Sequence, residues 1–256
     1  IPDTSAVKAR YAMSAVAQLL EGLHHDWHAW RPGALEDLNA AIAAGRAQLV
    51  DDRMAAVLTE GRALSCASGG LFDPAIGGLI EAWGFHADTP PEGAPPAPAV
   101  IEALRAGHPK MTDLQIAGDT VRSTNPAVQL DLGAYAKGAA LDLAEEVLRA
   151  HGIEDAVLNA GGGVQVMGHH AARPWHVAIR DPFQWGVVAA LDLAPGEALH
   201  TSGNYERFFE AGGVRFSHLI DPRSGWPVQG VVSVSVLNTN GARAAAAAPA
   251  LAVAGP

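Results

Sequence analysis

The sequence contains a single cysteine, Cys66, among 256 residues. An internal disulfide and a zinc cluster built on several thiolates are therefore excluded. Aromatic residues make up only 6% of the chain. No apolar run approaches the roughly 20 residues that a membrane-spanning helix needs, and the alanine-rich stretch 244–256 is too short and contains Pro249. These absences predict a chain without a disulfide framework and without a membrane span.

Basic residues are also scarce. Seventeen Lys and Arg against 27 Asp and Glu give a net charge of −10, and the basic residues form no cluster. Because a nucleic-acid backbone attracts clustered Lys and Arg, a nucleic-acid partner is not expected. What the chain does have is an apolar fraction of 49%. That fraction is sufficient for a real core, and the length fits one large domain or two small ones.

Apolar periodicity and turn residues predict both helices and strands. Helices are expected at 7–25, 51–68 and 134–151, with glycines ending the second and third. Strands are expected at 128–132, 156–159, 175–180, 187–193, 214–219 and 231–237. This order predicts an α+β fold in which helices pack on mixed sheets.

The stretch SHLIDPRSGWP (217–227) places a histidine and an aspartate three residues apart. Residues three apart on a strand point to opposite faces, so His218 and Asp221 converge only if the chain bends. Asp221-Pro222-Arg223-Ser224-Gly225 has the residues of a turn. Two interpretations remain open, a polar hairpin tip and a base with its orienting carboxylate.

The stretch LDLGAYAKG (130–138) has Asp131 at the end of a predicted strand and Lys137 in the first turn of the next helix. Free N–H groups at a helix start attract anions, whereas a lysine there is unfavourable unless an anion or a carboxylate neutralises it. The glycine spacing excludes a P-loop. Phosphate binding and an ordinary strand-to-helix turn both remain open.

Three other stretches also allow two interpretations. In 70–84, Phe72 and Trp83 either stack on a flat ligand ring or belong to the core, and Asp73 before proline presents its carboxylate from a bend. The glycines in NAGGGV (159–164) indicate either a close approach to a ligand or backbone, or a flexible bend. The hydroxyls and bare backbone of 201–203 suit phosphate or metal-bound oxygens, or structural hydrogen bonds.

Four motifs occur in one order along the chain: FDPAIGGLIEAWGF (72–85), LDLGAYAKGAALD (130–142), NAGGGVQVMG (159–168) and TSGNYERFF with SHLIDPRSGWPV (201–228). Together they resemble the FAD:protein FMN transferases, and the resemblance runs from about Trp30 to the C-terminal end. It implies one α+β domain over residues 1–256, with two lobes around a cleft for FAD and Mg²⁺ at the pyrophosphate. The implied enzyme moves the FMN half of FAD onto a Thr or Ser hydroxyl of a target flavoprotein and releases AMP.

The resemblance also implies roles for individual residues. Those expected to contact FAD are Trp30, where the family tends to have tyrosine, Leu71, Phe72, Asp73, Asp131, Lys137 and Ile220, to which we add Thr201, Ser202 and Gly203. The backbone carbonyl of Ala134 would face the metal. His218 would act as the base and Asp221 as its orienter, where the target hydroxyl arrives.

Two parts of the chain depart from the family pattern. On its last helix the family has an aspartate and, four residues later, a threonine, both of which bind magnesium. This chain has Ala245 and Pro249 there, and no Asp, Glu, Ser or Thr occurs from 241 to 256. Methyl and proline side chains cannot coordinate a cation that prefers oxygen. The family's Met-Gly-Thr motif is also not found before Trp30.

Three functions remain open on these grounds. The first is the transferase. The second is a flavin-binding carrier or maturation protein with weak or no transfer activity, because of Ala245 and Pro249. The third is an FAD pyrophosphatase in which water replaces the hydroxyl. Family members are commonly exported, so a periplasmic or otherwise exported location is expected, and a chain that opens without methionine is compatible with it.

Overall fold

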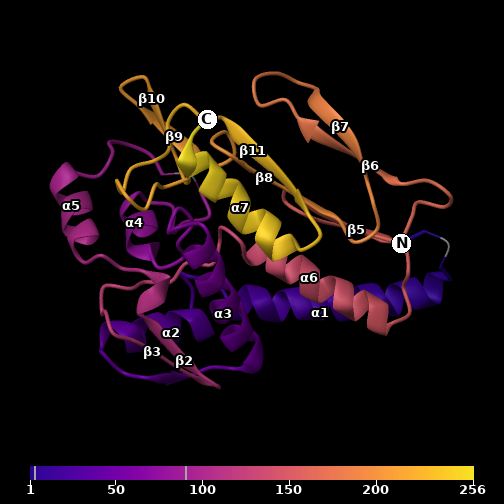
Figure 1. Ribbon diagram of the computed structural model, residues 1–256, viewed down its shortest axis with the longest axis horizontal. Coiled ribbons are helices and arrows are strands. Elements are labelled where there is room, and N and C mark those ends of the chain that lie inside the picture. Colours follow the sequence, from indigo (N-terminus) through magenta and orange to yellow (C-terminus); the bar gives the residue numbers. More distant parts are fainter. Residues whose placement is uncertain (3, 90) are drawn as a thin grey trace. The chain divides into compact units, whose positions relative to one another are not determined.

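The computed structural model (Figure 1) describes residues 1–2, 4–89 and 91–256. These residues divide into two compact units. The first unit comprises Ile1–His24, Tyr135–Ser202 and Ser233–Ala248. The second comprises His25–Ala134, Gly203–Val232 and Pro249–Pro256. Each unit therefore combines segments that lie far apart in the sequence.

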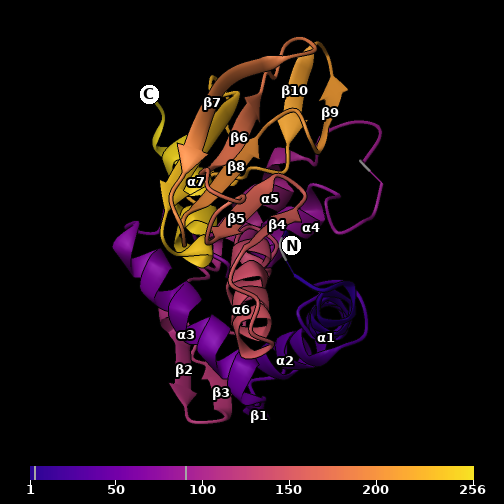
Figure 2. The ribbon, with the colours of Figure 1, turned by 90° about the vertical axis from the view of Figure 1, so that its right-hand side faces the viewer.

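The first unit is built on a four-stranded sheet with the order β11-β8-β5-β4 (Figures 1 and 2). Its strands are β4 (Ala156–Ala160), β5 (Gly163–Met167), β8 (Ala198–Gly203) and β11 (Ser233–Asn238). A separate hairpin consists of β6 (Trp175–Arg180) and β7 (Val187–Leu193). Partly buried side chains of this hairpin pack against a small core of Val166, Leu193 and Leu199.

Three helices contribute to the first unit: most of α1 (Ala6–Asp26), α6 (Ala136–Ala150) and the first part of α7 (Gly241–Ala254). Helix α6 packs on β4 and β5 through a face of alanines and leucines. A Cβ atom at Gly138 would lie 2.2 Å from the carbonyl oxygen of Gly241 and 2.8 Å from Cβ of Ala245. Glycine at position 138 therefore permits the close approach of α6 and α7.

The start of α7 is capped by a carboxylate from α6. The N–H groups of Gly241 and Ala242 each donate to Asp142, at 2.9 Å to Oδ1 and to Oδ2. These are among the N–H groups that have no partner within a helix. Burial raises the pKa of Asp142 above its usual range, because the loss of hydration outweighs these two bonds.

The second unit contains shorter elements. Its helices are α2 (Ala34–Ala43), α3 (Asp52–Ala67), α4 (Gly77–Ala82), α5 (Pro98–Ala106) and the 3₁₀ turn η1 (Met111–Asp113). Its strands are β1 (Gln48–Leu49), β2 (Leu114–Ala117) and β3 (Thr120–Ser123) in one antiparallel sheet, and β9 (Phe208–Ala211) and β10 (Val214–Ser217) in a hairpin.

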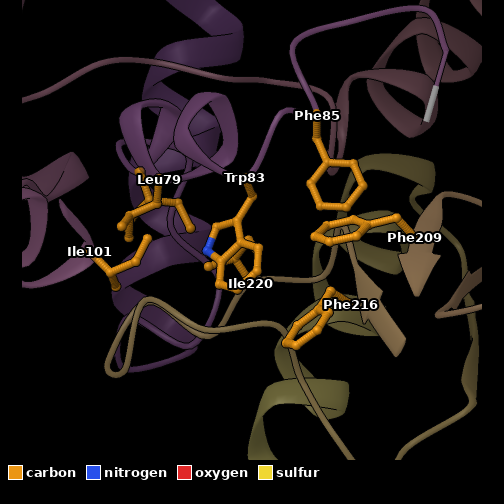
Figure 3. Packing of buried hydrophobic residues seen from close by; sticks show 8 residues of the cluster. Leu79, Trp83, Phe85, Ile101, Phe209, Phe216 and Ile220 are labelled. Atoms are coloured by element: carbon orange, nitrogen blue, oxygen red, sulfur yellow. The ribbon is translucent and has the colours of Figure 1, made fainter. Parts of the chain in front are cut away.

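The core of the second unit is centred on Trp83. Figure 3 shows its indole between the aliphatic side chains of Leu79 and Ile101 and the rings of Phe209 and Phe216. The ring centroids of Trp83 and Phe216 are 5.4 Å apart in a stacked arrangement. The indole Nε1–H donates to the carbonyl of Gly225 at 2.8 Å. Of the two interpretations of Trp83, the core position is therefore the one that the structure shows.

The α+β class is confirmed, with four small sheets in the part of the chain that the structure describes. The predicted helices correspond to α1, α3 and α6. The predicted strand at 128–132 is wrong, since only Gln129 forms an isolated bridge, with Ile76. The Leu130 backbone is hydrogen-bonded to the side chain of Asn39, whose amide nitrogen donates to the Leu130 carbonyl at 3.0 Å and whose amide oxygen accepts from the Leu130 N–H at 2.7 Å.

No helix among the described residues combines the length and the apolar composition that crossing a bilayer requires.

Candidate active site

A groove of about 540 Å³ opens on the second unit. It is lined by α2, by the segment that precedes α2, and by residues 126–129, with Glu81 and His86 from a third segment. Trp30 is the one residue among the predicted FAD contacts that lines it. A concave site of this size with an aromatic wall and a few polar groups is typical of ligand binding.

The wall of the groove is held by a buried pair, His86 and Asp131. The ring of His86 stacks on that of Trp30, with centroids 5.0 Å apart and planes 20° apart. Its Nε2 is hydrogen-bonded to Oδ2 of Asp131 at 2.9 Å, and each side chain is 6% exposed. The other oxygen of Asp131 accepts from the N–H of Gly133 at 2.7 Å. Asp131 thus acts on the groove through His86, a residue that the sequence reasoning missed although it directly follows the motif 72–85.

Arg207, which the sequence reasoning also missed, connects this wall with His218. Its guanidinium donates to the carbonyls of Phe85 and Ala87, at 2.8 and 2.6 Å, and lies 5.9 Å from the ring centroid of Trp30. The carbonyl oxygen of Arg207 accepts from the N–H of His218 at 3.0 Å and lies 3.2 Å from its Nδ1. Only the Nδ1–H tautomer can make that second bond, because a carbonyl only accepts. In neutral His218 the basic lone pair is therefore on Nε2.

The turn predicted after His218 is confirmed. The N–H of Gly225 donates to the Asp221 carbonyl at 2.8 Å, the N–H of Asp221 donates to the Trp226 carbonyl at 2.9 Å, and Gly225 has φ +73°. The carboxylate of Asp221 is bound by Arg223, with Nε at 3.0 Å from Oδ1 and Nη2 at 2.9 Å from Oδ2. The partner described for Nδ1 of His218 is the carbonyl oxygen of Arg207, which accepts its hydrogen, and the proposed role of Asp221 as orienter stays a prediction.

The carboxylate of Asp73 accepts hydrogen bonds from other residues of the second unit. It accepts from Oγ of Ser65 at 2.9 Å, from the N–H of Ala75 at 2.9 Å and from the N–H of Met111 at 3.1 Å. Burial raises the pKa of Asp73 above its usual range, because the lost hydration outweighs these bonds. Phe72 is buried as well. What this segment offers to a ligand is therefore its backbone and the half-buried Leu71.

Other predicted FAD contacts also have structural partners. Ile220 is a member of the core cluster in Figure 3. The hydroxyl of Thr201 is hydrogen-bonded to that of Ser235 at 2.7 Å, across β8 and β11. A Cβ atom at Gly203 would lie 2.4 Å from the Tyr205 ring, so glycine there permits this packing. Ser202 is half-buried.

In the first unit, Lys137 lies beside the glycine turn between β4 and β5. Its Nζ donates to the carbonyl of Gly161 at 3.3 Å. Gly161 and Gly162 have φ of +55° and +97°, a region that favours glycine, so the motif NAGGGV forms a tight turn at a fixed place.

The described residues do not fit a magnesium site made of side chains. No group of three His, Cys, Asp or Glu within them is placed to hold a metal ion. Ala245 is buried, with its methyl against Gly138, and Pro249 lies inside α7. Magnesium prefers oxygen ligands, which neither position supplies. The carbonyl of Ala134, an exposed residue two positions before the start of α6, is the remaining implied contact.

The chain is similar in sequence to proteins named FAD:protein FMN transferase. The chain is 67% identical to an FAD:protein FMN transferase of Rhodobacter capsulatus over 97% of its own length and 47% of the relative's. It is 38% identical to one of Treponema pallidum over 79% of its own length and 60% of the relative's. The chain thus spans about half to three fifths of the curated relatives it matches.

Solved structures of ApbE proteins also match this chain. The ApbE protein of Thermotoga maritima matches with a TM-score of 0.88 and 28% identity, over 95% of this chain and 79% of that one. The apo flavinyl transferase ApbE of Pseudomonas stutzeri matches with a TM-score of 0.86 and 30% identity, over 100% of this chain and 79% of that one. The model of the ApbE family matches residues 3–256. The chain therefore belongs to the ApbE family.

Proposed function

We propose that this chain binds FAD and transfers its FMN half to a Thr or Ser hydroxyl of an acceptor flavoprotein. The names of two relatives, which are 67% and 38% identical to it over the aligned residues, support the transfer of FMN from FAD to a protein. The observation that carries it is the contact of 3.2 Å between Nδ1 of His218 and the Arg207 carbonyl oxygen, a hydrogen bond that only a protonated Nδ1 can make. A histidine held in this way presents Nε2 as a general base.

The reaction that these residues would support is a displacement at phosphorus. The hydroxyl oxygen of the acceptor forms a bond to the phosphorus of the FMN half, and the bond from that phosphorus to the bridging oxygen breaks. AMP leaves with the electron pair of that bond, and Nε2 of His218 takes the hydroxyl proton. Lys137 would offset the negative charge of the phosphates, and Trp30 would present an aromatic surface to a flat ring.

A magnesium ion at the pyrophosphate is part of what the resemblance implies. Since positions 245 and 249 supply no oxygen ligand, we derive no step from such an ion. If the reaction needs it, the ligands would have to be backbone oxygens such as that of Ala134, phosphate oxygens and water. An exported, periplasmic location is likewise proposed from the resemblance alone. Cell fractionation with an antibody tests it, and protein found only in the cytoplasm would contradict it.

The decisive experiment incubates the chain with FAD and a purified acceptor flavoprotein, in parallel with Mg²⁺ and with EDTA. Mass spectrometry of the acceptor and chromatography of the nucleotides follow. The proposal expects an acceptor carrying one FMN and an equal amount of AMP. Replacing the base, His218→Gln, should slow transfer by about 10²–10⁴-fold, whereas the exposed His169→Gln is the matched control.

Each other outcome identifies a different function. AMP and FMN without an adduct would indicate a pyrophosphatase. Bound FAD without turnover would indicate a carrier, an alternative that the relatives' names do not favour. A chain that binds no flavin at all would overturn the proposal.

A further inference from the structure

Arg207, in the second unit, is a half-buried arginine whose side chain has no role in the proposed reaction. It directly precedes β9, and its backbone continues the pairing of the hairpin β9–β10. Ser217, at the end of β10, pairs with Phe208, and the N–H of the next residue, His218, donates to the Arg207 carbonyl at 3.0 Å. The hairpin therefore places the backbone of Arg207 beside His218.

The side chain of Arg207 holds the backbone on both sides of His86. Its Nη2 donates to the carbonyl of Phe85 at 2.8 Å and to that of Ala87 at 2.6 Å. These residues follow α4 and belong to neither a helix nor a strand, so the carbonyl groups are not part of a backbone ladder. Because one nitrogen binds the carbonyls before and after it, His86 keeps a fixed direction towards Trp30, on which its ring stacks.

Phe85 also connects Arg207 with the imidazole of His218. Its side chain is fully buried in the core cluster of the second unit (Figure 3). Its ring meets the imidazole edge-on, with centroids 6.2 Å apart and planes 68° apart. The imidazole is thus contacted at two places, by the Phe85 ring and by the Arg207 carbonyl oxygen, which lies 3.2 Å from Nδ1. Together with the bond from the guanidinium to the Phe85 carbonyl, these contacts form a closed loop.

We propose that Arg207 is a positioning residue for His218. Its guanidinium holds Phe85 against the imidazole, and this restricts rotation of the imidazole so that Nδ1 stays in line with the Arg207 carbonyl. Nε2 then keeps one direction. A general base needs such a direction, because a small misplacement of the reacting groups can cost about 10²-fold in rate. The inference rests on the proposed function, in which His218 is the base.

Substitution of Arg207 by methionine tests this role. Arg207→Met keeps an apolar side chain and removes both hydrogen bonds to segment 85–87. With saturating FAD, kcat for FMN transfer should fall about ten- to a hundredfold. Arg207→Lys, which keeps the charge and its donors but loses the planar fork, should recover part of the rate.

Arg62 provides the matched control. It belongs to the same unit and also donates to a backbone carbonyl, that of Leu114, at 3.1 Å. Arg62→Met removes this hydrogen bond and should leave kcat close to that of the wild type. An equal loss of kcat in Arg62→Met and Arg207→Met would indicate a general effect on the fold and would overturn the inference.

A double variant shows whether Arg207 acts through the base. In a protein that already carries His218→Gln, Arg207→Met should lower kcat little further, because the group that Arg207 positions is missing. A further loss as large as that in the wild type would show that Arg207 acts independently of His218, and the inference would be wrong.

A second measurement needs no flavin. Nitrogen NMR of protein with isotope-labelled histidines reports which ring nitrogen carries the proton, and comparison with His218→Gln assigns the signals of His218. At about pH 8, above the ordinary pKa of histidine, the wild type and Arg62→Met should show the Nδ1–H form. Arg207→Met should show a mixture that includes the Nε2–H form.

The outcomes separate the inference from the proposed function. A tautomer of His218 that Arg207→Met leaves unchanged would overturn the inference, whether or not the wild type transfers FMN. Absence of transfer by the wild type, together with the expected change of tautomer, would overturn only the proposed function.

Discussion

His200 should make this protein less stable in mild acid than a variant that lacks this histidine. Burial, and next to it the positive charge of Lys137, lower its pKa in the folded protein to about 4, against 6.5 for an ordinary histidine. Between these two values the unfolded chain binds a proton that the folded protein does not. By linkage, the free energy of unfolding then decreases as the pH decreases. The stabilisation is present above about pH 6.5 and is lost progressively as the pH falls towards 4.

The size of this effect follows from the same two values. Each pH unit in this window changes the free energy of unfolding by about 1.4 kcal/mol for one proton. From pH 6.5 to pH 5 the wild type should lose about 1.5 kcal/mol through His200, somewhat less than the full slope because the unfolded histidine is only half protonated at pH 6.5. His200→Leu cannot take up this proton. As the pH falls over this range, the free energy of unfolding of the variant should thus rise by about 1.5 kcal/mol relative to that of the wild type.

Urea unfolding of both proteins at several pH values between 7 and 5, followed by circular dichroism and fluorescence, measures this difference. The exposed His169→Gln serves as the control and should follow the wild type. Parallel curves for the wild type and His200→Leu would refute the reasoning, because they would show that His200 binds its proton equally well in the folded and unfolded states.

Three further predictions concern the first unit. Asp142→Ala removes the acceptor for two N–H groups of α7 and should lower the free energy of unfolding in urea by about 1–2 kcal/mol. The control, Glu146→Ala at an exposed position, should change the free energy of unfolding little. Equal effects of the two substitutions would contradict the capping role. Gly163→Ala brings a methyl within 2.3 Å of the His200 ring and should lower stability by about 1–3 kcal/mol, and a melting temperature equal to that of the wild type would show that the ring is not confined there. Ala245→Asp buries a carboxylate against Gly138 and should lower the melting temperature in EDTA. Recovery of the melting temperature in Mg²⁺ would show that this position can contribute to a metal site. An unchanged melting temperature in EDTA would contradict the burial argument.

Local signals in the sequence were sufficient to predict where the main helices begin and end. Helix α3 begins after Asp51, whose side chain accepts from the N–H of Met54, and it ends before Gly69 and Gly70 at positive φ. The turn Asp221–Gly225 was likewise predictable from its proline and glycine. In each case the residue that sets the boundary lies within a few positions of it, so periodicity and capping are visible in a single chain.

Contacts between distant segments were not predictable in this way. The predicted strand at 128–132 does not form, and the Leu130 backbone is hydrogen-bonded to Asn39, which lies 91 residues away. The hydrogen bond between His86 and Asp131 spans 45 residues. Arg207 lies within the motif TSGNYERFF, but nothing local shows that its guanidinium binds the carbonyls of Phe85 and Ala87, about 120 residues earlier.

By itself the sequence determined the class of fold, the ends of the main helices, the scarcity of basic charge, the missing oxygen ligands at 245 and 249, and a family resemblance that the comparisons bear out. Only the tertiary structure decided which candidate side chains belong to the interior and which face a groove. Trp83 and Ile220 are in the core, whereas Trp30 lines the groove. The physical reason is that helix caps and turns depend on neighbours along the chain. Burial and side-chain partners depend on which distant segments the packing brings together.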